Sequence, residues 1–331
     1  MRAVRLLDAH LLELEEVPEP EAMPGEVVIQ VDGCGICGSD LSSYKVGLFA
    51  ETVPGHELAG TVHAVGDGVA AWQVGDTAVI DPKIPCGSCD DCRSGAGYRC
   101  AMALTAGIGF ARDGGFAERV AVPAANLHRL PAGLALEHAC LVEPLSVAIH
   151  GVARARAHPG AAAVVVGLGP IGLLTVATLH ARGAGPIVGV DPVADRRQLA
   201  LDLGATAAVA EIREVRGVVG PVAAVIECSG HAPVLQAAAD LVTTGGRLVL
   251  VGVPFGETTV APIMWVTREI EIIGSIASST ADFEVSLAML AADPAIARIV
   301  TRRASLAELP QAFEELITPA SGGKVIVDPR L

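Results

Sequence analysis

Residues 162–191 constrain the fold more than any other part of the chain. An apolar run at 162–166 predicts a buried strand, and a glycine-rich turn follows it directly. The turn opens a predicted helix that continues to about Arg182. A second apolar strand at 186–190 ends at Asp191. The order of strand, tight turn, helix and strand predicts a βαβ unit with two parallel strands.

The turn itself reads Gly167-Leu-Gly169-Pro170-Ile171-Gly172. Its glycines permit a tight turn and the close approach of a pyrophosphate to the helix N-terminus. Asp191, about 20 residues downstream, can accept hydrogen bonds from an adenosine ribose. A lone GxGxxG is a weak signal, but the flanking strand, helix and acid together predict a dinucleotide-binding unit.

The choice between the two nicotinamide dinucleotides depends on the residues around Asp191. Its carboxylate favours NAD over NADP, because it would repel a 2′-phosphate. Arg196 and Arg197 point the other way, since an arginine just beyond the strand can accept that phosphate. We expect NAD.

The alternation of strands and helices continues downstream. It predicts a doubly wound parallel sheet of the α/β class. The further strands are expected at 222–227, 247–252 and 269–274, and the helices at 232–241 and about 282–291.

The first 145 residues have a different pattern, with short β-type runs separated by turns. Runs at 27–31, 58–65 and 74–80 predict strands of a twisted antiparallel barrel or sandwich that carries its site on loops. Beyond about Asp293 the sequence predicts a helix at 306–318 and a strand at 324–327. The pattern does not decide whether this tail adds a seventh strand to the parallel sheet or returns to the first region.

Four cysteines lie close together within the first region. Two-residue gaps followed by a longer one suit a single tetrahedral zinc ion with no open position, which is a structural site. An iron–sulfur cluster also takes four cysteines, but its common spacings differ. A pair of disulfides would need an oxidising compartment. The four residues are Cys86, Cys89, Cys92 and Cys100.

A second set of metal-ligating residues lies upstream, in Cys34-Gly-Ile-Cys37-Gly-Ser39-Asp40 and in Gly55-His56-Glu57. A thiolate, an imidazole and a carboxylate are the mixed ligands of a catalytic zinc that keeps one position open. We predict that Cys37 and His56 bind zinc. The alternative is a small buried core cysteine and a loop histidine.

Glu143 stands in an otherwise apolar stretch, residues 134–149. A lone buried carboxylate needs a partner, and a metal would be one. Equally, Glu143 can be an acid at a helix start with Pro144 at the first helical position. The sequence leaves both interpretations open.

Charge and hydropathy exclude some classes of function. The 331 residues carry a net charge of −14 and no Lys/Arg-rich run, which argues against a nucleic-acid partner. The uncharged run at 160–179 is long enough to span a bilayer, but its glycines and Pro170 suit a strand, turn and helix better. With no signal-peptide pattern at the start, we expect a cytoplasmic protein with reduced cysteines and no membrane partner.

Taken together, these motifs resemble the zinc-dependent medium-chain dehydrogenase/reductase (alcohol dehydrogenase) family, and most closely its sorbitol, threonine and butanediol dehydrogenase-like branch. The resemblance covers essentially the whole chain. Besides the segments at Cys37, His56 and the four cysteines, it rests on residues 113–118, on Glu143-Pro-Leu-Ser146 and on the dinucleotide motif.

The resemblance implies a Rossmann sheet inserted into a GroES-like β-barrel catalytic domain, with the active site in the cleft between them. The implied boundaries are 1–146 for the catalytic domain with its zinc lobe at 86–100, 147–289 for the NAD-binding domain, and 290–331 for a return to the catalytic domain. Relatives are homodimers or homotetramers through the edge of the Rossmann sheet.

The resemblance also implies roles for single residues. Cys37 and His56 are zinc ligands, and the shell is completed by Glu57, by Glu143 or by water, with Glu57 ranked first. Asp40 holds the imidazole of His56, and Ser39 hydrogen-bonds the substrate oxygen and accepts its proton. The cofactor residues are Gly167, Gly169, Pro170, Ile171, Gly172, Asp191, Arg196 and Val253.

One position departs from the family. Many relatives have a histidine five residues after the zinc cysteine as the outer member of a proton relay, and here that residue is Ser42. Either water and Ser42 complete the relay, or the proton leaves by another route. Ser42 makes the pocket mouth smaller and more polar. We therefore expect hydride transfer between NAD and a secondary alcohol or ketone of a polyol, sugar alcohol or aminocyclitol. The alternatives are a dehydrogenase of simple alcohols or aldehydes and a non-catalytic NAD-binding protein on the same fold.

Overall fold

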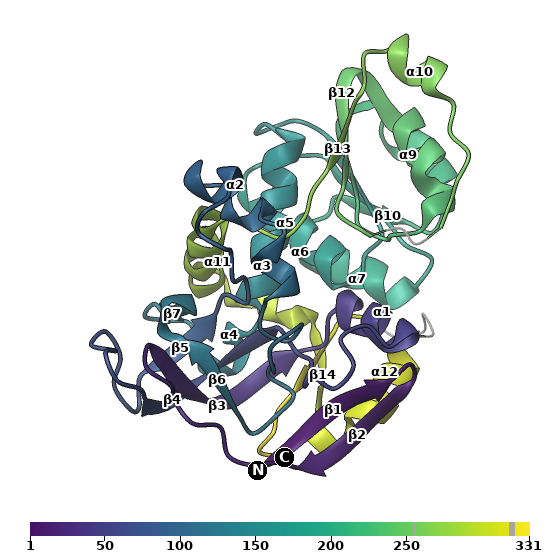
Figure 1. Cartoon of the computed structure of the whole chain (residues 1–331). Helices are drawn as coiled ribbons and strands as arrows, with labels where there is room; N and C mark the ends of the chain where they lie inside the picture. Colours follow the sequence, from purple (N-terminus) through teal and green to yellow (C-terminus); the bar gives the residue numbers. More distant parts are fainter. Residues whose placement is uncertain (254–255, 318–321) are drawn as a thin grey trace. The chain divides into compact units, whose positions relative to one another are not determined.

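The computed structural model describes the chain except residues 254–255 and 318–321, and the chain divides into two compact units (Figure 1). The first unit comprises Met1–Glu143, Phe283–Ala320 and Lys324–Leu331, and the second comprises Pro144–Asp282 and Ser321–Gly323. Two of the crossings between the units lie within helices, α5 (Val142–Ala155) and α11 (Thr280–Ala292). The boundaries expected from the sequence, 146/147 and 289/290, fall in these same helices.

The second unit is built on a six-stranded parallel sheet in the order β10-β9-β8-β11-β12-β13. The strand order reverses beside β8, which makes the sheet doubly wound, as the alternation predicted. All four residues of β8 and of β9 are buried, in keeping with a parallel sheet covered on both faces. The strands are β8 (Ala163–Val166), β9 (Ile187–Val190), β10 (Ala207–Val209), β11 (Val222–Glu227), β12 (Val242–Leu250) and β13 (Glu271–Gly274).

Helices of this unit follow its strands. They are α6 (Pro170–Ala181), α7 (Ala194–Asp202), α8 (Val215–Val218), α9 (Leu235–Leu241) and α10 (Pro262–Val266), with 3-10 helices at Ile212–Glu214 and Ala232–Val234. The apolar run at 160–179 forms β8, the glycine turn and most of α6. No helix among the described residues combines the length and the apolar composition needed to cross a membrane.

The first unit holds a seven-stranded, mainly antiparallel sheet in the order β14-β15-β3-β4-β5-β7, with β6 paired to β3, and a separate hairpin of β1 and β2. Among the strand pairs that the structure describes in this unit, β14 and β15 alone are parallel. The strands of the first unit are β1 (Arg2–Asp8), β2 (Leu11–Glu16), β3 (Glu26–Gly35), β4 (Glu57–Val65), β5 (Thr77–Ile80), β6 (Arg119–Pro123), β7 (Leu127–Arg129), β14 (Val300–Ala304) and β15 (Lys324–Val327).

Short helices connect these strands. They are α1 (Gly38–Val46), α2 (Asp90–Arg93), α3 (Met102–Thr105), α4 (Leu136–Ala139) and α12 (Leu309–Ile317), with 3-10 helices at Gly97–Arg99, Ala124–Asn126, Pro294–Ile299 and Leu306–Glu308. A hydrophobic cluster joins the N-terminal part of this unit to the tail, and in it Phe116 and Phe313 meet edge to face with ring centroids 5.9 Å apart.

The tail settles the alternative that the sequence left open. Strand β15 lies between β14 and β3, and it pairs antiparallel with Cys34 and Gly35 of β3. The tail therefore returns to the first unit, and the alternative of a seventh strand on the parallel sheet is wrong. Hydrogen bonding to β3 decides this, and it has no signature in the tail's own sequence.

Several element limits differ from the sequence prediction. Strand β5 starts at Thr77 rather than at 74, because Gly75 (φ +94°) and Asp76 form a turn in which Asp76 accepts a bond from Gln73. Strand β12 starts at Val242 rather than at 247, since Gly245 (φ +71°) interrupts the run without ending it.

Two helices are shorter than expected. The segments 232–234 and 306–308 form 3-10 helices before α9 and α12, and each of these α-helices therefore starts three residues later than predicted. Pro233 lies in the first of these 3-10 helices, where its missing N–H costs nothing at a helix start. The expected helix end at residue 318 lies outside the described residues.

Candidate active site and zinc sites

Cys37 and His56 are brought together by the first helix of the chain. Helix α1 begins directly after Cys37, and Asp40 in its first turn accepts a hydrogen bond from the Cys37 backbone N–H at 2.8 Å. The other oxygen of Asp40 lies 3.3 Å from His56 Nδ1. A carboxylate at Nδ1 fixes the ring and leaves Nε2 for a metal ion.

Local backbone geometry places His56 at the start of β4. Gly55 has φ +99°, and a Cβ there would lie 2.8 Å from Cys34 Sγ and 3.0 Å from the ring of Phe116. Only glycine combines this conformation with this packing. The tight turn therefore directs the imidazole towards Cys37 and α1.

The resulting group fits a catalytic zinc ion. Ligand atoms of Cys37, His56 and Glu57 all lie within 4.8 Å of one another. Glu57 is fully buried, and its Oε1 finds no hydrogen-bond donor among the described residues. Burial lowers the pKa of His56, but the charges of Asp40 and Cys37 outweigh it and leave the pKa well above its usual value. A buried cluster of thiolate, imidazole and carboxylates suits a divalent cation.

Ser39 lies beside this group. Its hydroxyl is 3.5 Å from His56 Nε2, the nitrogen that Asp40 leaves for the metal. Ser42 lies one turn further along α1, and its hydroxyl donates to the Gly38 carbonyl at 3.0 Å. In this conformation the Ser42 hydroxyl forms its hydrogen bond within its own helix.

Glu143 lies in the first turn of α5 and is 8 % exposed. Burial raises its pKa, the charge of His56 lowers it and that of Glu57 raises it, and the resulting pKa is about 7. These couplings place Glu143 near the group of Cys37, His56 and Glu57, although it is not among the atoms within 4.8 Å. Because α5 begins at Val142, Pro144 is the third helical residue rather than the first.

Sequence reasoning missed three residues at this site. Phe110 stacks on the His56 ring with centroids 4.8 Å apart and planes 25° apart, and Phe49 meets Phe110 edge to face at 5.7 Å. Lys324, the first residue of β15, forms an ion pair with Glu57. Phe110 has no motif around it, and Lys324 stands 267 residues from Glu57 in the sequence.

Tyr44, two residues beyond Ser42 in α1, is packed with its hydroxyl satisfied. The ring is 3 % exposed and lies against Phe313, and the hydroxyl donates to Glu314 and to the His10 carbonyl. Burial, together with the Glu314 hydrogen bond, raises the pKa of Tyr44 to about 12.

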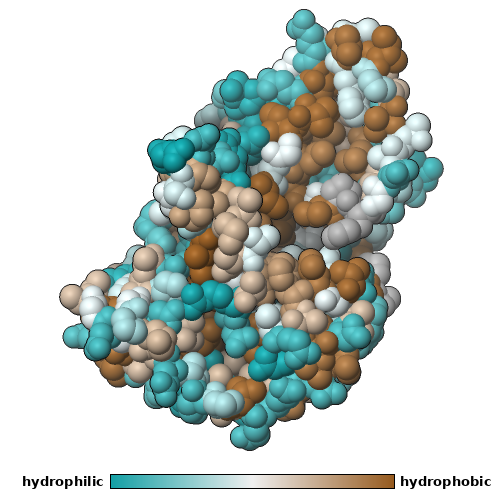
Figure 2. Space-filling view, in the orientation of Figure 1, coloured by the Kyte–Doolittle hydropathy of each residue, from teal (hydrophilic) through white to brown (hydrophobic). Residues whose placement is uncertain are grey.

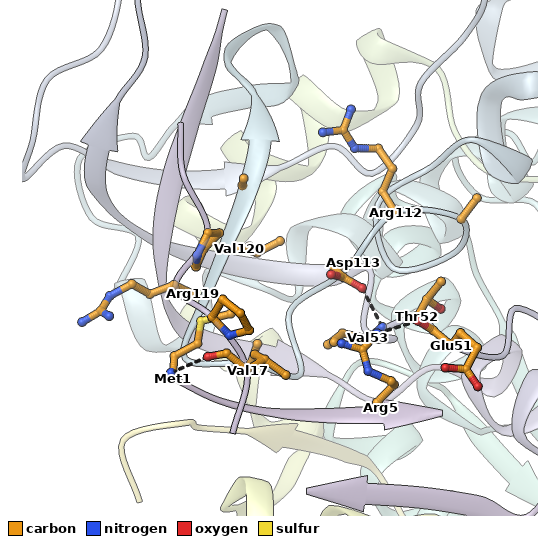
Figure 3. Close-up of a pocket in the computed structure, with 15 residues that line it drawn as sticks. Met1, Arg5, Val17, Glu51, Thr52, Val53, Arg112, Asp113, Arg119 and Val120 are labelled. Carbon is orange, nitrogen blue, oxygen red and sulfur yellow. Dashed lines mark hydrogen bonds between the residues drawn. The ribbon is translucent and has the colours of Figure 1, made fainter. Parts of the chain in front are cut away.

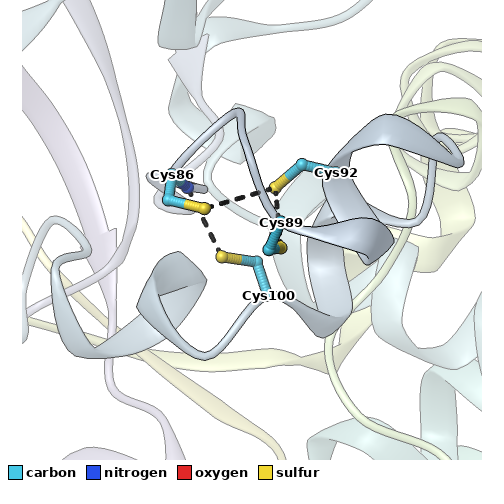
Figure 4. A group of neighbouring side chains, drawn as sticks. All are labelled: Cys86, Cys89, Cys92 and Cys100. Carbon is cyan, nitrogen blue, oxygen red and sulfur yellow. Dashed lines mark hydrogen bonds between the residues drawn. The ribbon is translucent and has the colours of Figure 1, made fainter.

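The four cysteines converge on one point in the lobe of α2 and the following 3-10 helix (Figure 4). The Sγ atoms of Cys89 and Cys92 are 3.4 Å apart, and those of Cys86 and Cys92 are 3.9 Å apart. A zinc–sulfur bond of 2.3 Å in a tetrahedron gives sulfur separations of about 3.8 Å. The cluster therefore fits a structural zinc ion.

The dinucleotide motif forms the turn from β8 into α6. Gly167 has φ +86°, and a Cβ there would lie 2.6 Å from Ser229 N. Gly172 leaves no room for a Cβ against the Gly167 carbonyl, whereas a Cβ on Gly169 would meet nothing within 4 Å. Pro170 begins α6, and Ile171 follows it. The open space at Gly169 is what a pyrophosphate at the helix N-terminus requires.

Asp191 closes this site at the end of β9. Its two oxygens accept hydrogen bonds from the backbone of Leu168 at 2.8 Å and of Val193 at 2.9 Å, and Arg196 lies 3.5 Å from one of them. Each carboxylate oxygen keeps a lone pair for a ribose hydroxyl. Val253 lies after β12 and is 59 % exposed.

A hollow of about 540 Å³ lies elsewhere in the first unit, beside the β1–β2 hairpin (Figure 3). Three arginines line it, and each is paired with a glutamate, Arg5 with Glu15, Arg112 with Glu26 and Arg119 with Glu19. None of the predicted site residues lines this hollow.

Comparison with known proteins agrees with the geometry. Residues 23–132 match the family described as alcohol dehydrogenase GroES-like domain, and residues 170–292 match the zinc-binding dehydrogenase family. D-altritol 5-dehydrogenase of Agrobacterium fabrum is 32 % identical over 93 % of this chain and 94 % of its own length. Sorbitol dehydrogenase of Bacillus subtilis is 33 % identical over 83 % of this chain and 81 % of its own.

A solved structure shares the whole fold. A zinc-binding dehydrogenase of Sinorhizobium meliloti, bound to NADP, is 34 % identical, covers 99 % of both chains and superposes with a TM-score of 0.90. A mixed thiolate, imidazole and carboxylate site carried with a dinucleotide fold defines a zinc- and nicotinamide-dependent oxidoreductase. The chain belongs to the zinc-dependent medium-chain alcohol dehydrogenases, in their sorbitol dehydrogenase-like branch. Zinc and NAD(P) are its cofactors, and a small alcohol or ketone is its substrate.

Proposed function

We propose that the protein oxidises a secondary hydroxyl of a polyol or sugar alcohol with NAD, or runs the reverse reduction. The observation that carries the proposal is the convergence of Cys37, His56 and Glu57 with the Ser39 hydroxyl 3.5 Å from the metal-facing nitrogen of His56. Relatives named for altritol, sorbitol and xylulose support the polyol class. An aminocyclitol belongs to the same hydroxylated class.

Each residue of the site has a separate role in the reaction. Cys37 and His56 hold the metal, and Asp40 fixes the tautomer and orientation of His56. When bound there, zinc supplies a Lewis acid for the substrate oxygen, and the nicotinamide accepts the hydride. Ser39 hydrogen-bonds the substrate hydroxyl, orients it and accepts its proton.

Beyond Ser39 the proton has no histidine to reach. Because the Ser42 hydroxyl donates to Gly38 and lies at the exposed surface, we propose that solvent takes the proton from Ser39 and that Ser42 acts only through the polarity of the pocket mouth.

Three candidates can complete the metal shell: the Glu57 carboxylate, the Glu143 carboxylate or a water molecule. Glu57 is the first candidate, since its oxygen lies within 4.8 Å of the other two ligand atoms. Glu143, with its pKa near 7, is the second.

We propose NAD as the preferred dinucleotide. Asp191 is 3 % exposed at the end of β9, and its charge would oppose a 2′-phosphate. The nearby Arg196 moderates this preference, because it can turn from Asp191 to a phosphate. The expected order is therefore NAD before NADP, with measurable use of both.

A simple secondary alcohol or an aldehyde is the second candidate substrate. The observation in its favour is the aromatic pair of Phe49 and Phe110 against His56, which gives one side of the site an apolar wall. A substrate with a short apolar arm would gain from this wall. The non-catalytic alternative predicts loss of zinc ligands, whereas all of the predicted ligands are present here.

We propose a homodimer formed through β13. This edge strand of the parallel sheet carries Ile272, 37 % exposed, and apolar side chains gather around nearby α10 (Figure 2). An unpaired apolar edge of this kind can pair with its own copy. We further propose domain boundaries at 146/147 and 289/290, a homotetramer as the larger alternative, and a cytoplasmic location that keeps the zinc-binding thiols reduced.

Zinc content and substrate oxidation test the proposal together. Purified wild-type protein should hold two zinc ions per chain and Cys37→Ser one, with loss of NAD reduction. A panel of polyols, aminocyclitols and simple secondary alcohols then decides between the two substrate classes. One zinc ion in both proteins, with no turnover of any compound, would restore the non-catalytic alternative.

A further inference from the structure

A lysine and a glutamate are buried together where three strands of the first unit meet. Gly35 at the end of β3 pairs with Glu57 on β4, and on its other side with Ile326 on β15. Lys324 begins β15. The strand register therefore places Lys324, from the C-terminal part of the chain, and Glu57, from the N-terminal part, beside the segment that holds Cys37.

Both members of this pair are removed from water. Glu57 is 0 % and Lys324 2 % exposed. The Lys324 ammonium pairs with Glu57 Oε2 and donates to the Ile36 carbonyl at 2.7 Å, one residue before Cys37. Lys324 thus contacts both segments that carry the proposed zinc ligands, one at Ile36 beside Cys37 and the other at Glu57 beside His56.

The backbone leaves room for this contact. A Cβ on Gly35 would lie 2.1 Å from Glu57 Oε2 and 2.7 Å from Lys324 Cε. Any side chain at position 35 would push the carboxylate or the lysine away. The absence of a side chain at Gly35 is therefore a condition for the ion pair.

Stability alone does not explain such a pair. Replacing a buried ion pair by apolar residues is often neutral or stabilising, because the desolvation of two charges offsets their attraction. Here the carboxylate is also the one within 4.8 Å of the Cys37 and His56 ligand atoms. When a carboxylate is paired with an ammonium, the positive charge of the ammonium reduces the attraction of the carboxylate for a metal ion nearby.

We propose that Lys324 is a positioning residue of the catalytic zinc site, which holds the Glu57 carboxylate and limits the charge that Glu57 offers to the metal. The inference rests on the proposed zinc site at Cys37 and His56. With Lys324 present, Glu57 can leave the metal shell at low cost, so that water or substrate takes the position. Without Lys324, the carboxylate stays on the metal.

Metal binding in a double-mutant cycle tests this inference. Wild type, Lys324→Met, Glu57→Gln and the double variant are each loaded with zinc and, separately, with Co²⁺ as a spectroscopic substitute. We expect Lys324→Met to bind zinc about tenfold more tightly and to shift the visible Co²⁺ bands, since one buried charge contact is typically of that size. Lys324→Arg keeps the charge and should restore the wild-type spectrum.

The Glu57→Gln background provides the control. There, Lys324→Met should change neither zinc affinity nor the Co²⁺ spectrum, because Lys324 acts through Glu57. The double variant buries no unpaired charge, so it remains a test even where Lys324→Met alone does not fold. A difference between the double variant and Glu57→Gln would overturn the inference.

The outcomes separate this inference from the proposed function. Two zinc ions in wild type with unchanged affinity and spectrum in Lys324→Met would overturn the role of Lys324 alone. A single zinc ion in wild type, bound only by the four cysteines, would overturn the catalytic site and the role of Lys324 with it.

Discussion

Asp40 joins the two most important side chains of the site. One of its oxygens accepts the backbone N–H of Cys37 at 2.8 Å, and the other lies 3.3 Å from His56 Nδ1. The same carboxylate caps α1 and orients the imidazole. Helix formation at α1 is thereby coupled to the geometry of the metal site.

Replacing Asp40 should therefore weaken zinc binding. We expect Asp40→Ala to lower zinc affinity at the Cys37 site by roughly 10- to 100-fold, as is typical when the carboxylate behind a ligating histidine is lost. Asp40→Asn, which can still accept one hydrogen bond, should lose less. Competition with a chromophoric chelator measures both, and equal affinity in all three proteins would contradict the role assigned to Asp40.

Ser39 and Ser42 should differ in their effect on turnover. Ser39→Ala removes the proposed proton acceptor and should lower kcat by about 100-fold or more. Ser42→Ala removes a hydroxyl that bonds to its own helix, so kcat should change by only a few-fold. Steady-state kinetics at several pH values separate the two, and comparable losses in both variants would show that the proton passes through Ser42.

The four-cysteine lobe should contribute stability rather than chemistry. Cys89→Ser should lower the zinc content from two to one per chain and lower Tm by several degrees, since roughly 1 kcal/mol corresponds to 2–4 °C for domains of this size. Ser94→Ala, an exposed change in the same lobe, is the matched control and should keep both ions. Metal analysis and calorimetry give the readouts, and a Cys89→Ser protein that keeps two zinc ions would refute the site.

Arg196 should matter for NADP and little for NAD. Arg196→Ala removes a cation that lies 3.5 Å from the Asp191 carboxylate and that we expect to turn towards a 2′-phosphate. We expect kcat/KM for NADP to fall about tenfold, the effect of one lost charge-assisted contact, with NAD changed less than twofold. The ratio of the two cofactors is the measurement. Equal losses with both would indicate a structural role for Arg196 at the start of α7.

Much of the fold was open to prediction because its signals are local. The apolar run of β8, the glycines of the following turn and the acid at the end of β9 lie within 30 residues, and backbone geometry ties each to its place. Clustered cysteines are similarly informative, since short spacings confine four thiolates to one lobe. The polar motifs around Cys37 and His56 predict the mixed ligand set for the same reason.

What the sequence alone determined is therefore the class of fold, the dinucleotide turn and the candidate ligands of the two zinc sites. Tertiary structure decided the rest. The pattern of the tail did not decide its place, and the pairing of β15 with β3 is what brings Lys324 to Glu57. Only packing places Phe110 on His56. The physical reason is that contacts between residues hundreds of positions apart depend on strand register and core packing, which leave no periodicity or spacing in either segment.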